Sequence, residues 1–504
     1  MLRMLIVLIA STAVAAQPSA DYRVVVERER LGSFWGAVLV VDRGEVVLAE
    51  GFGLQDPESL DPIDADTLFD IGSVSKPITA IAVLQLVERG QLTLETTMRD
   101  LFGDLAGEDG DAITIRHLLT HTAGLDDRRA LQRLDLDDRD EAVRLALAAP
   151  RQSPPGERWA YSNAGYVLLA AAIEVATGQG FEAVVREGVF EPAGMTASGF
   201  LDGRGVDGPL DGDRFSVRQV MPQGRRIRRG LLDDGWGWGL RGAGGVLTSA
   251  GDLARLHTAL LASRDGREGA LLRPESIERM DLVAIEGPVP MALGWIGLDA
   301  PDGTPKRSHG GSTRGFLAEW RRYPDRGATI AVLTNTDGDP RGLADALEAE
   351  LLGIAPSRVD VEIHREGVAF NRHDHGTVSE PSFDIKRADD EIVLTAEGDR
   401  GVALVLRMSE VTARRAAASL VSIAEMDLDN AVNATSLGLG TRPYEASGDR
   451  LVIDDDWLEL RVQPDYNRQP GPTLIVDDPA RGFWPVLLRL SDEDAATLTR
   501  LLGG

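Results

Sequence analysis

The order of strand-like and helix-like segments most strongly constrains the fold of this chain. Apolar runs at residues 37–41 and 46–49 surround Asp42-Arg43-Gly44-Glu45, a pattern that predicts a β-hairpin over residues 36–54. Further strand-like segments follow only much later, at residues 292–298, 306–311, 316–323 and 328–335. We therefore expect the hairpin and the late strands to form one antiparallel sheet, with the intervening segment inserted between them.

Helical patterns dominate the inserted segment up to about residue 285. Apolar residues recur at helical spacing after Ser73 and stop at Gly90, so Ser73 is expected at a helix N-terminus. The apolar run at residues 164–176 is shorter than the ~20 residues that span a bilayer, which favours a buried helix. A last helical pattern at residues 341–352 closes the unit. The fold class is therefore mixed, with helices and a sheet in one domain (α/β in the broad sense, α+β in detail).

A chain of 504 residues exceeds one ordinary hydrophobic core, because domains average about 150 residues. Gly353-Ile354-Ala355-Pro356 resembles a linker, so we expect a first domain over residues 22–353. Residues 357–504 hold short strand-like segments separated by Gly, Asp and Pro, which predict a separate, mostly β accessory domain. These segments are residues 383–385, 391–395, 402–408, 450–453, 457–462 and 473–476.

The first residues have the layout of a secretory signal peptide. Arg3 precedes a short apolar run, and small residues follow up to Ala16, so we expect residues 1–16 to be removed. The run is too short for a membrane anchor, which leaves no stable membrane span after cleavage and predicts a periplasmic or secreted protein. The chain has no cysteine, which excludes lipid attachment through an N-terminal cysteine. A chain of this length can be exported without disulfides.

The charge balance excludes one class of partner. The chain carries 80 acidic and 53 basic residues, a net charge of −27, without a basic patch, so nucleic acid should be repelled. A small molecule or a peptide is the expected substrate, and the oligomeric state does not follow from the sequence.

Lysine is rare in this chain, and one lysine lies close to a serine. Lys76, Lys306 and Lys386 are the only lysines, and Lys76 follows Ser73 by three residues in Gly72-Ser73-Val74-Ser75-Lys76-Pro77. A buried lysine can lose its proton, which an arginine effectively cannot, so a lysine placed here can act as a base toward the serine. The spacing alone is also compatible with an exposed lysine on a helix.

Three further segments accompany Ser73 and Lys76. Tyr161-Ser162-Asn163 precedes the apolar helix, where a phenol and an amide can reach a cleft. His309-Gly310-Gly311-Ser312 lies on a predicted strand, and its glycines would allow a substrate to lie against the backbone. The third segment is residues 114–125, which contains His117 and His121.

Together these residues resemble the serine β-lactamase and penicillin-binding-protein superfamily, in particular its branch of class C β-lactamases, DD-carboxypeptidases, D-aminopeptidases and β-lactamase-like esterases. The order and approximate spacing of the motifs agree over residues 30–352 and do not extend to the C-terminal segment. The resemblance implies a β-lactamase/transpeptidase-like fold, in which an antiparallel sheet is flanked by helices and a helical subdomain. It also implies a serine hydrolase that needs no cofactor and no metal.

The resemblance also suggests a role for each motif residue. Ser73 would be the acylated nucleophile and Lys76 its proton-handling partner, while Tyr161 would shuttle protons to the leaving group. Asn163 would orient the substrate and the Lys76 head. The backbone N–H groups of Ser73 and Ser312 would form the oxyanion hole, next to Gly310 and Gly311. Free lysine and tyrosine both titrate near ~10, so the sequence does not decide which of the two accepts the serine proton.

The chain departs from the family pattern beside His309. Members that bind β-lactams or terminal D-alanine usually have Lys-Thr-Gly or His-Thr-Gly there, and the threonine hydroxyl helps to hold the substrate carboxylate. Gly310 stands in place of that threonine. A charge-assisted hydrogen bond contributes ~1.5–3 kcal/mol, so its loss favours action on esters or on peptides without that carboxylate.

The remaining histidines do not indicate a metal site. His117 and His121 lie four apart on a helix expected to end at Gly124, but no third ligand accompanies them, which favours packing or capping. His373-Asp374-His375 is interpreted as a polar loop, and Asp454-Asp455-Asp456 as a solvated turn.

The sequence leaves three functions open besides that of an ester- or amide-cleaving hydrolase. In the first, the protein is a β-lactamase, a D-Ala-D-Ala carboxypeptidase or a D-aminopeptidase that acts on cell-wall-type peptides. In the second, it is a cell-envelope binding protein that keeps the fold without turnover, although Ser73, Lys76, Tyr161 and Asn163 are all present. In the third, the C-terminal domain is the main ligand-binding module, and the hydrolase is accessory to it.

Overall fold

The computed structural model describes residues 22–29, 34–55, 60–125, 136, 138–202, 205–207, 237–285, 289–313, 315–336 and 340–354, and beyond these only strand backbones. The expected signal peptide, His373-Asp374-His375 and Asp454-Asp455-Asp456 lie outside the described residues.

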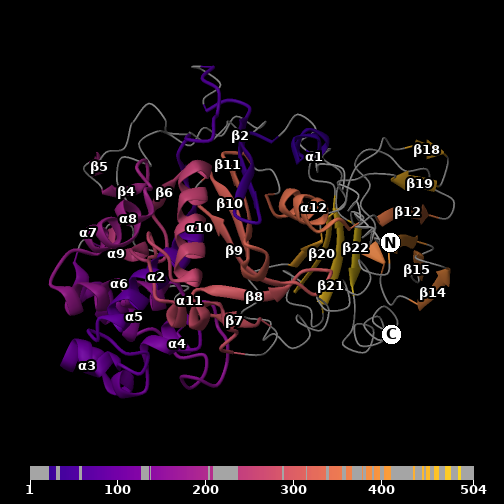
Figure 1. The fold of residues 1–504 in the computed structure, drawn as a ribbon. Coiled ribbons are helices and arrows are strands. Elements are labelled where there is room, and N and C mark those ends of the chain that lie inside the picture. Colours follow the sequence, from indigo (N-terminus) through magenta and orange to yellow (C-terminus); the bar gives the residue numbers. More distant parts are fainter. Residues whose placement is uncertain are drawn as a thin grey trace, which may run out of the picture.

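The central sheet has seven antiparallel strands in the order β2-β1-β11-β10-β9-β8-β7 (Figure 1). The predicted hairpin therefore pairs with the last strand of the domain, as the segment order indicated, and the antiparallel-sheet prediction is confirmed. The strands are β1 (Gly36–Asp42), β2 (Glu45–Phe52), β7 (Met291–Ala292), β8 (Trp295–Asp299), β9 (Pro305–Ser312), β10 (Leu317–Tyr323) and β11 (Ala328–Thr334).

Helices cover both faces of this sheet, with α12 and α1 on one side and α10 on the other (Figure 1). Successive residues of a strand point to opposite faces. In β1, Ala37 and Leu39 accordingly pack in the core shared with the helical region, whereas Val38 and Val40 pack against α1 and α12. Because both faces are buried, β1 has a continuous apolar run instead of an alternating pattern.

The helices are α1 (Tyr22–Glu29), α2 (Ser75–Glu88), α3 (Met98–Phe102), α4 (Ile115–Leu119), α5 (Arg139–Leu147), α6 (Asn163–Thr177), α7 (Phe181–Val185), α8 (Glu191–Ala193), α9 (Gly237–Leu240), α10 (Ala250–Asp265), α11 (Pro274–Asp281) and α12 (Pro340–Leu352). The buried helix expected at residues 164–176 is α6, against which α2, α4 and α5 pack. Ser249 caps α10 by accepting a hydrogen bond from the Asp252 N–H at 3.1 Å.

Three local predictions need correction. The single strand expected at residues 292–298 is two strands, β7 and β8, because Gly294 has φ +83° and reverses the chain. The helix expected to end at Gly124 ends at Leu119, since His121 has left-handed φ +55°. The helical region also contains a small sheet of β3 (Phe69–Asp70), β6 (Val246–Thr248), β4 (Gly199–Asp202) and β5 (Gly205–Asp207). Strands of two to four residues are too short for a periodic signal.

Strands also occur at all six segments for which they were expected beyond residue 357, within two sheets. The strands of these sheets are β12 (Val359–Arg365), β13 (Thr377–Val378), β14 (Ser382–Ala388), β15 (Glu391–Glu397), β16 (Val402–Ser409), β17 (Thr435–Leu437), β18 (Glu445–Ser447), β19 (Arg450–Ile453), β20 (Glu459–Pro464), β21 (Pro472–Asp477) and β22 (Val486–Arg489).

Within the described part of the chain, no helix is by itself long and apolar enough to cross a bilayer. One bent pair, Asn163–Thr177 with Phe181–Ala193, meets the test by length and composition only.

Candidate active site

Ser73 lies in a single 3-10 turn, Gly72–Val74, directly before α2. Gly72 has φ +51°, and its N–H donates to the Asp70 carboxylate at 2.9 Å. A β-carbon at Gly72 would lie 2.9 Å from the Ser312 nitrogen, so no larger residue fits. The turn is therefore held tightly against the end of β9, with Ser73 at the start of the helix, as predicted.

Lys76 lies one helical turn beyond Ser73 and is fully buried. Its Nζ donates to Ser73 Oγ at 3.0 Å, to Asn163 Oδ1 at 2.8 Å and to the Ala243 carbonyl at 2.9 Å. An ammonium has three N–H donors, so this arrangement suits the charged form of the side chain. The first two contacts join two motifs that are 87 residues apart in the sequence.

Tyr161 approaches Ser73 from the segment that leads into α6. Its hydroxyl donates to Ser73 Oγ at 2.7 Å, and Lys76 Nζ lies 4.8 Å from the centre of its ring. Ser162 is the N-cap of α6, with extended φ −142°, and its side chain accepts from the Gly165 N–H at 3.3 Å. This cap fixes the turn that presents Tyr161 and Asn163 on either side of Ser162.

The two hydrogen bonds to Ser73 restrict how its proton can leave. With Lys76 as an ammonium and Tyr161 as a phenol, both partners donate to Oγ. Ser73 can pass its proton on only after one partner has lost its own. Both atoms are within hydrogen-bond distance, so the geometry admits either as the base.

The end of β9 runs past the Ser73 turn along an open edge. β8 pairs with β9 only as far as Ser308, so none of the described strands pairs with residues 309–312 on that edge. A β-carbon at Gly311 would lie 2.0 Å from the Ile71 carbonyl oxygen, so glycine is required for this close approach. The arrangement brings the Ser312 backbone next to the turn that contains Ser73.

His309 is buried beside this edge. Its Nδ1 donates to the Gly310 carbonyl at 2.8 Å. Burial, together with the charge of Lys76, lowers the pKa of His309 from 6.5 to about 4. At neutral pH the imidazole is therefore uncharged.

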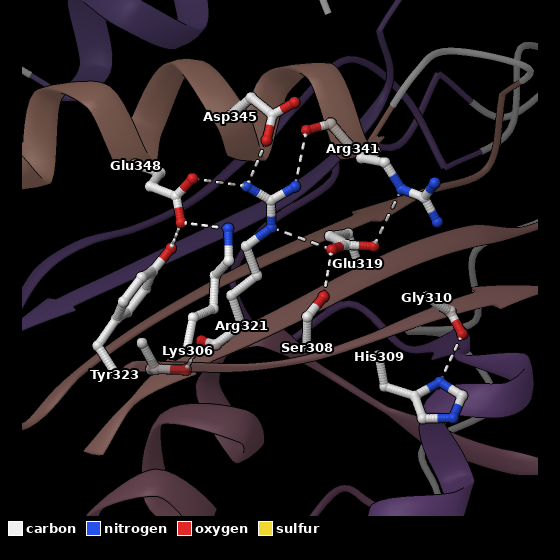
Figure 2. Close-up of polar contacts among 11 residues, drawn as sticks. Lys306, Ser308, His309, Gly310, Glu319, Arg321, Tyr323, Arg341, Asp345 and Glu348 are labelled. Atoms are coloured by element: carbon white, nitrogen blue, oxygen red, sulfur yellow. Dashed lines mark hydrogen bonds and ion pairs between the residues drawn. The ribbon is translucent and has the colours of Figure 1, made fainter. Parts of the chain in front are cut away.

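A side chain at position 310 would point to the face of the sheet opposite His309, toward the ionic network that lies beneath α12 (Figure 2). A β-carbon there would lie 3.2 Å from Glu319 Oε2 and 3.5 Å from Arg341 Nη2. Glu319 accepts from Ser308 at 2.8 Å and from Arg321 at 3.0 Å. Burial raises the pKa of Glu319, but the two arginines and these hydrogen bonds outweigh it and keep the carboxyl ionised. A threonine at position 310 would thus contact the Glu319 carboxylate.

The same network joins β9 to α12 (Figure 2). Lys306 contacts Glu348 at 2.7 Å, Tyr323 donates to the same carboxylate at 2.7 Å, and Arg321 contacts Asp345 at 2.7 Å. These groups are all buried or nearly so, so removing one partner would leave an uncompensated charge.

The sequence patterns did not indicate two contributions to the site. The first is the segment of residues 242–246, in which the Ala243 carbonyl accepts a hydrogen bond from Lys76. It is held by Thr79, which donates to the Gly242 carbonyl at 2.8 Å, and by Ser75, which accepts from the Val246 N–H at 3.2 Å. The second is Asp70, which anchors Gly72. The contribution of Ala243 comes from its backbone carbonyl, which every residue has, so no sequence pattern indicates it.

The two histidines of residues 114–125 have separate local roles. His117 lies at the third position of α4, and its Nδ1 accepts from the Thr114 N–H at 3.3 Å, so the predicted capping role is confirmed. His121 packs against Tyr161, with ring centres 4.5 Å apart. No cluster of three or more His, Cys, Asp or Glu that would suit a metal occurs among the residues with described positions.

We expect the protein to lose stability in acid, because a buried histidine that is neutral in the folded state gains a proton on unfolding. Burial and the charge of Arg322 lower the pKa of His257 from 6.5 to about 3. Between these values the unfolded chain binds more protons than the folded chain, so lowering the pH through this window favours unfolding. From pH 7.5 to pH 5, His257 alone should reduce the unfolding free energy by about 2 kcal/mol.

Urea unfolding of the wild type and of His257→Gln at both pH values would measure this loss. The fall in unfolding free energy should be about 2 kcal/mol smaller in the variant. Equal falls in the two proteins would show that His257 titrates normally in the folded state.

Comparisons with known proteins agree with this geometry. The family model described as Beta-lactamase matches residues 27–353. The chain is 29% identical to a penicillin-binding protein of Bacillus subtilis (strain 168), over 61% of this chain and 69% of that protein. It is 33% identical to Esterase EstB of Burkholderia gladioli, over 60% of this chain and 86% of the esterase.

A solved structure covers more of the chain. The octameric penicillin-binding protein homologue from Pyrococcus abyssi superposes with a TM-score of 0.57 at 21% identity, covering 88% of this chain and 93% of that one. At this identity the likeness concerns the fold, and it agrees with the antiparallel sheet and helical region described above.

Proposed function

Because this chain belongs to the Beta-lactamase family, we propose that it cleaves ester or amide bonds through an acyl-enzyme formed on Ser73. The chain is a serine hydrolase. We propose Ser73 as its nucleophile and ester or amide bonds as its targets. The observation that carries it is the convergence of Lys76 Nζ, at 3.0 Å, and Tyr161 Oη, at 2.7 Å, on a serine oxygen at a helix N-terminus.

In the proposed reaction, one of Lys76 and Tyr161 is first deprotonated; Ser73 Oγ then attacks the acyl carbonyl and transfers its proton to that deprotonated partner. The backbone N–H groups of Ser73 and Ser312 stabilise the oxyanion, and one such donor typically contributes ~3 kcal/mol. Tyr161 then protonates the leaving group, which departs. Water attacks the acyl-enzyme by the same route in reverse, releases the acid and restores Ser73.

The proposed substrates are uncharged or weakly charged acyl esters, rather than β-lactams. The low pKa of His309 leaves its imidazole uncharged at neutral pH, so this position offers no charge to a substrate carboxylate. A side chain at position 310 would point toward Glu319 on the opposite face of the sheet, so the hydroxyl expected there from the resemblance does not contribute to this preference. Similarity to Esterase EstB supports the same choice.

We expect short-chain p-nitrophenyl esters to be hydrolysed with a kcat/KM at least tenfold above that for nitrocefin. Tenfold corresponds to ~1.4 kcal/mol in the transition state, less than one charge-assisted hydrogen bond. Steady-state kinetics with both substrates, in one preparation at one pH, measure the ratio. Nitrocefin turnover that matches the ester activity would instead identify the protein as a β-lactamase.

Parallel labelling with a fluorescent fluorophosphonate and a fluorescent penicillin distinguishes an esterase from enzymes of cell-wall peptides and from a binding protein. Labelling by both reagents at similar rates would favour a β-lactamase, a D-Ala-D-Ala carboxypeptidase or a D-aminopeptidase. Labelling by neither, with no turnover, would favour a non-catalytic binding protein of the same fold. We expect labelling by the fluorophosphonate alone, or labelling by the fluorophosphonate at a much higher rate than by the penicillin.

We further propose that the protein is exported, on the basis of the signal-like pattern of residues 1–16. Expression with the native N-terminus, cell fractionation and N-terminal sequencing test this directly. The mature chain should begin at Gln17 and be found outside the cytoplasm. An intact N-terminus in the cytoplasmic fraction would contradict the proposal.

A further inference from the structure

His121 lies directly beneath the Tyr161 side chain and is almost completely buried, with 2% of its surface exposed. Its ring contacts the ring of Tyr161, with centres 4.5 Å apart and an interplanar angle of 32°. It also contacts Tyr166 of α6, with centres 5.2 Å apart. The imidazole thus occupies the space between the start of α6 and the residue that donates to Ser73.

His121 also holds the backbone on both sides of Tyr161. Its Nδ1 accepts from the Ser162 N–H at 3.1 Å, and its carbonyl accepts from the Ala160 N–H at 2.8 Å. The residue before Tyr161 and the residue after it are therefore both bound to this single histidine. Asn163, which contacts Lys76, is the next residue along the chain.

Two unfavourable features are concentrated at His121. Its φ of +55° lies in the left-handed region, which is strained for a residue other than glycine. Its buried Nε2 has no hydrogen-bond partner among the residues that the structure describes, which is unfavourable for a buried polar atom. Strain and unpaired buried polar groups persist where other interactions over-determine the geometry, and they cluster at functional sites.

The imidazole is also electrically neutral. Burial, with the nearby charge of Lys76 and the neighbouring His309, holds the pKa of His121 well below its ordinary 6.5. The ring therefore packs against Tyr161 without adding a second cation next to Lys76. Its Nδ1 accepts a hydrogen bond, so the proton of the neutral ring is on Nε2.

We propose that His121 is a positioning residue for the reaction: it holds the Tyr161 hydroxyl against Ser73 and Asn163 against Lys76, without touching the substrate. This inference rests on the proposed function. A displacement of about 1 Å in a reacting group can cost a hundredfold in rate, so the ring contact and the Ser162 hydrogen bond should both affect turnover.

Two variants separate these contributions. His121→Asn tolerates a left-handed backbone and can accept from the Ser162 N–H, but it removes the ring. His121→Phe keeps a ring against Tyr161 but removes the acceptor. The matched control is His117→Gln, four residues earlier in the same motif, because glutamine at this position preserves the capping box of α4.

The experiment measures kcat and KM for a p-nitrophenyl ester, with kcat expressed per Ser73 that a fluorophosphonate labels at completion. Normalising to labelled sites removes any effect of unfolded protein. We expect at least one of the His121 variants to lose tenfold or more in kcat per labelled site, with KM changed less than threefold. His117→Gln should stay within twofold of the wild type in both parameters.

A kcat per labelled site within twofold of the wild type in both His121 variants would overturn the inference, even if their melting temperatures fall. That outcome would assign His121 a purely structural role. The proposed function has a separate test. A wild-type protein that is neither labelled by the fluorophosphonate nor able to hydrolyse the ester would refute the proposed function, and the positioning role with it.

Discussion

Replacement of Ser73 by alanine should reduce kcat/KM for p-nitrophenyl esters by at least about a thousandfold and abolish fluorophosphonate labelling. Covalent catalysis requires the hydroxyl, and no neighbouring group can form the same acyl-enzyme. The fold should persist, because Lys76 keeps its contacts with Asn163 and the Ala243 carbonyl. Circular dichroism and steady-state kinetics on the purified variant measure the two effects separately.

Ser75→Ala provides a matched control two residues away. Ser75 is also buried in the first turn of α2, but its Oγ accepts from the Val246 N–H, so its role is structural. This variant should lose some stability and keep labelling at Ser73. Ester turnover that survives in Ser73→Ala would refute the assignment of Ser73 as the nucleophile. If turnover were lost in Ser75→Ala instead, Ser75 would take that role.

Lys76→Arg should be nearly as damaging, with a loss of about a hundredfold or more in kcat. Arginine keeps the positive charge but cannot deprotonate near neutral pH, so it cannot act as a base or pass on the serine proton. The guanidinium is also larger than the ammonium, and Nζ is surrounded by three acceptors in a fully buried position. Single-turnover acylation rates with an ester, measured by stopped flow, would detect the loss.

Lys306→Arg tests whether the effect belongs to the site. Lys306 is also buried, but it pairs with Glu348 at 2.7 Å in the network beneath α12, where a guanidinium can form the same ion pair. Its kcat per labelled site should stay close to that of the wild type. Near-normal acylation in Lys76→Arg would mean that Lys76 contributes only its charge.

The parts of the fold that depend on apolar periodicity could be predicted from the sequence. The hairpin, the late strands and the helix after Ser73 were all predictable, because their burial imposes a repeating pattern on the residues. The split between β7 and β8 was not, since a single Gly294 in a left-handed conformation interrupts an otherwise continuous apolar segment. The two-residue strand β3 is too short for any pattern.

The candidate site was predictable to the extent that its groups are side chains in recognisable spacings. Ser73 and Lys76 are one helical turn apart, and Tyr161 and Asn163 flank a helix cap, so each pair indicates a local geometry. That the two pairs converge depends on the packing of α2 against α6, which the sequence does not reveal. The role of His121 could not be predicted for another reason. Its spacing from His117 indicates that both histidines lie on one helix, but that helix, α4, ends at Leu119, before His121.

The pairing of β1 with β11 has a consequence for how the protein is made. Gly36 is opposite Thr334, so a ribosome must add about 300 residues before β11, the second neighbour of β1, exists. At about 5–20 residues per second, β1 remains for roughly 15–60 s with both of its apolar faces and one edge uncovered. The central sheet can therefore be completed around β1 only after β11 has been synthesised, and the nascent chain must be protected from aggregation until then.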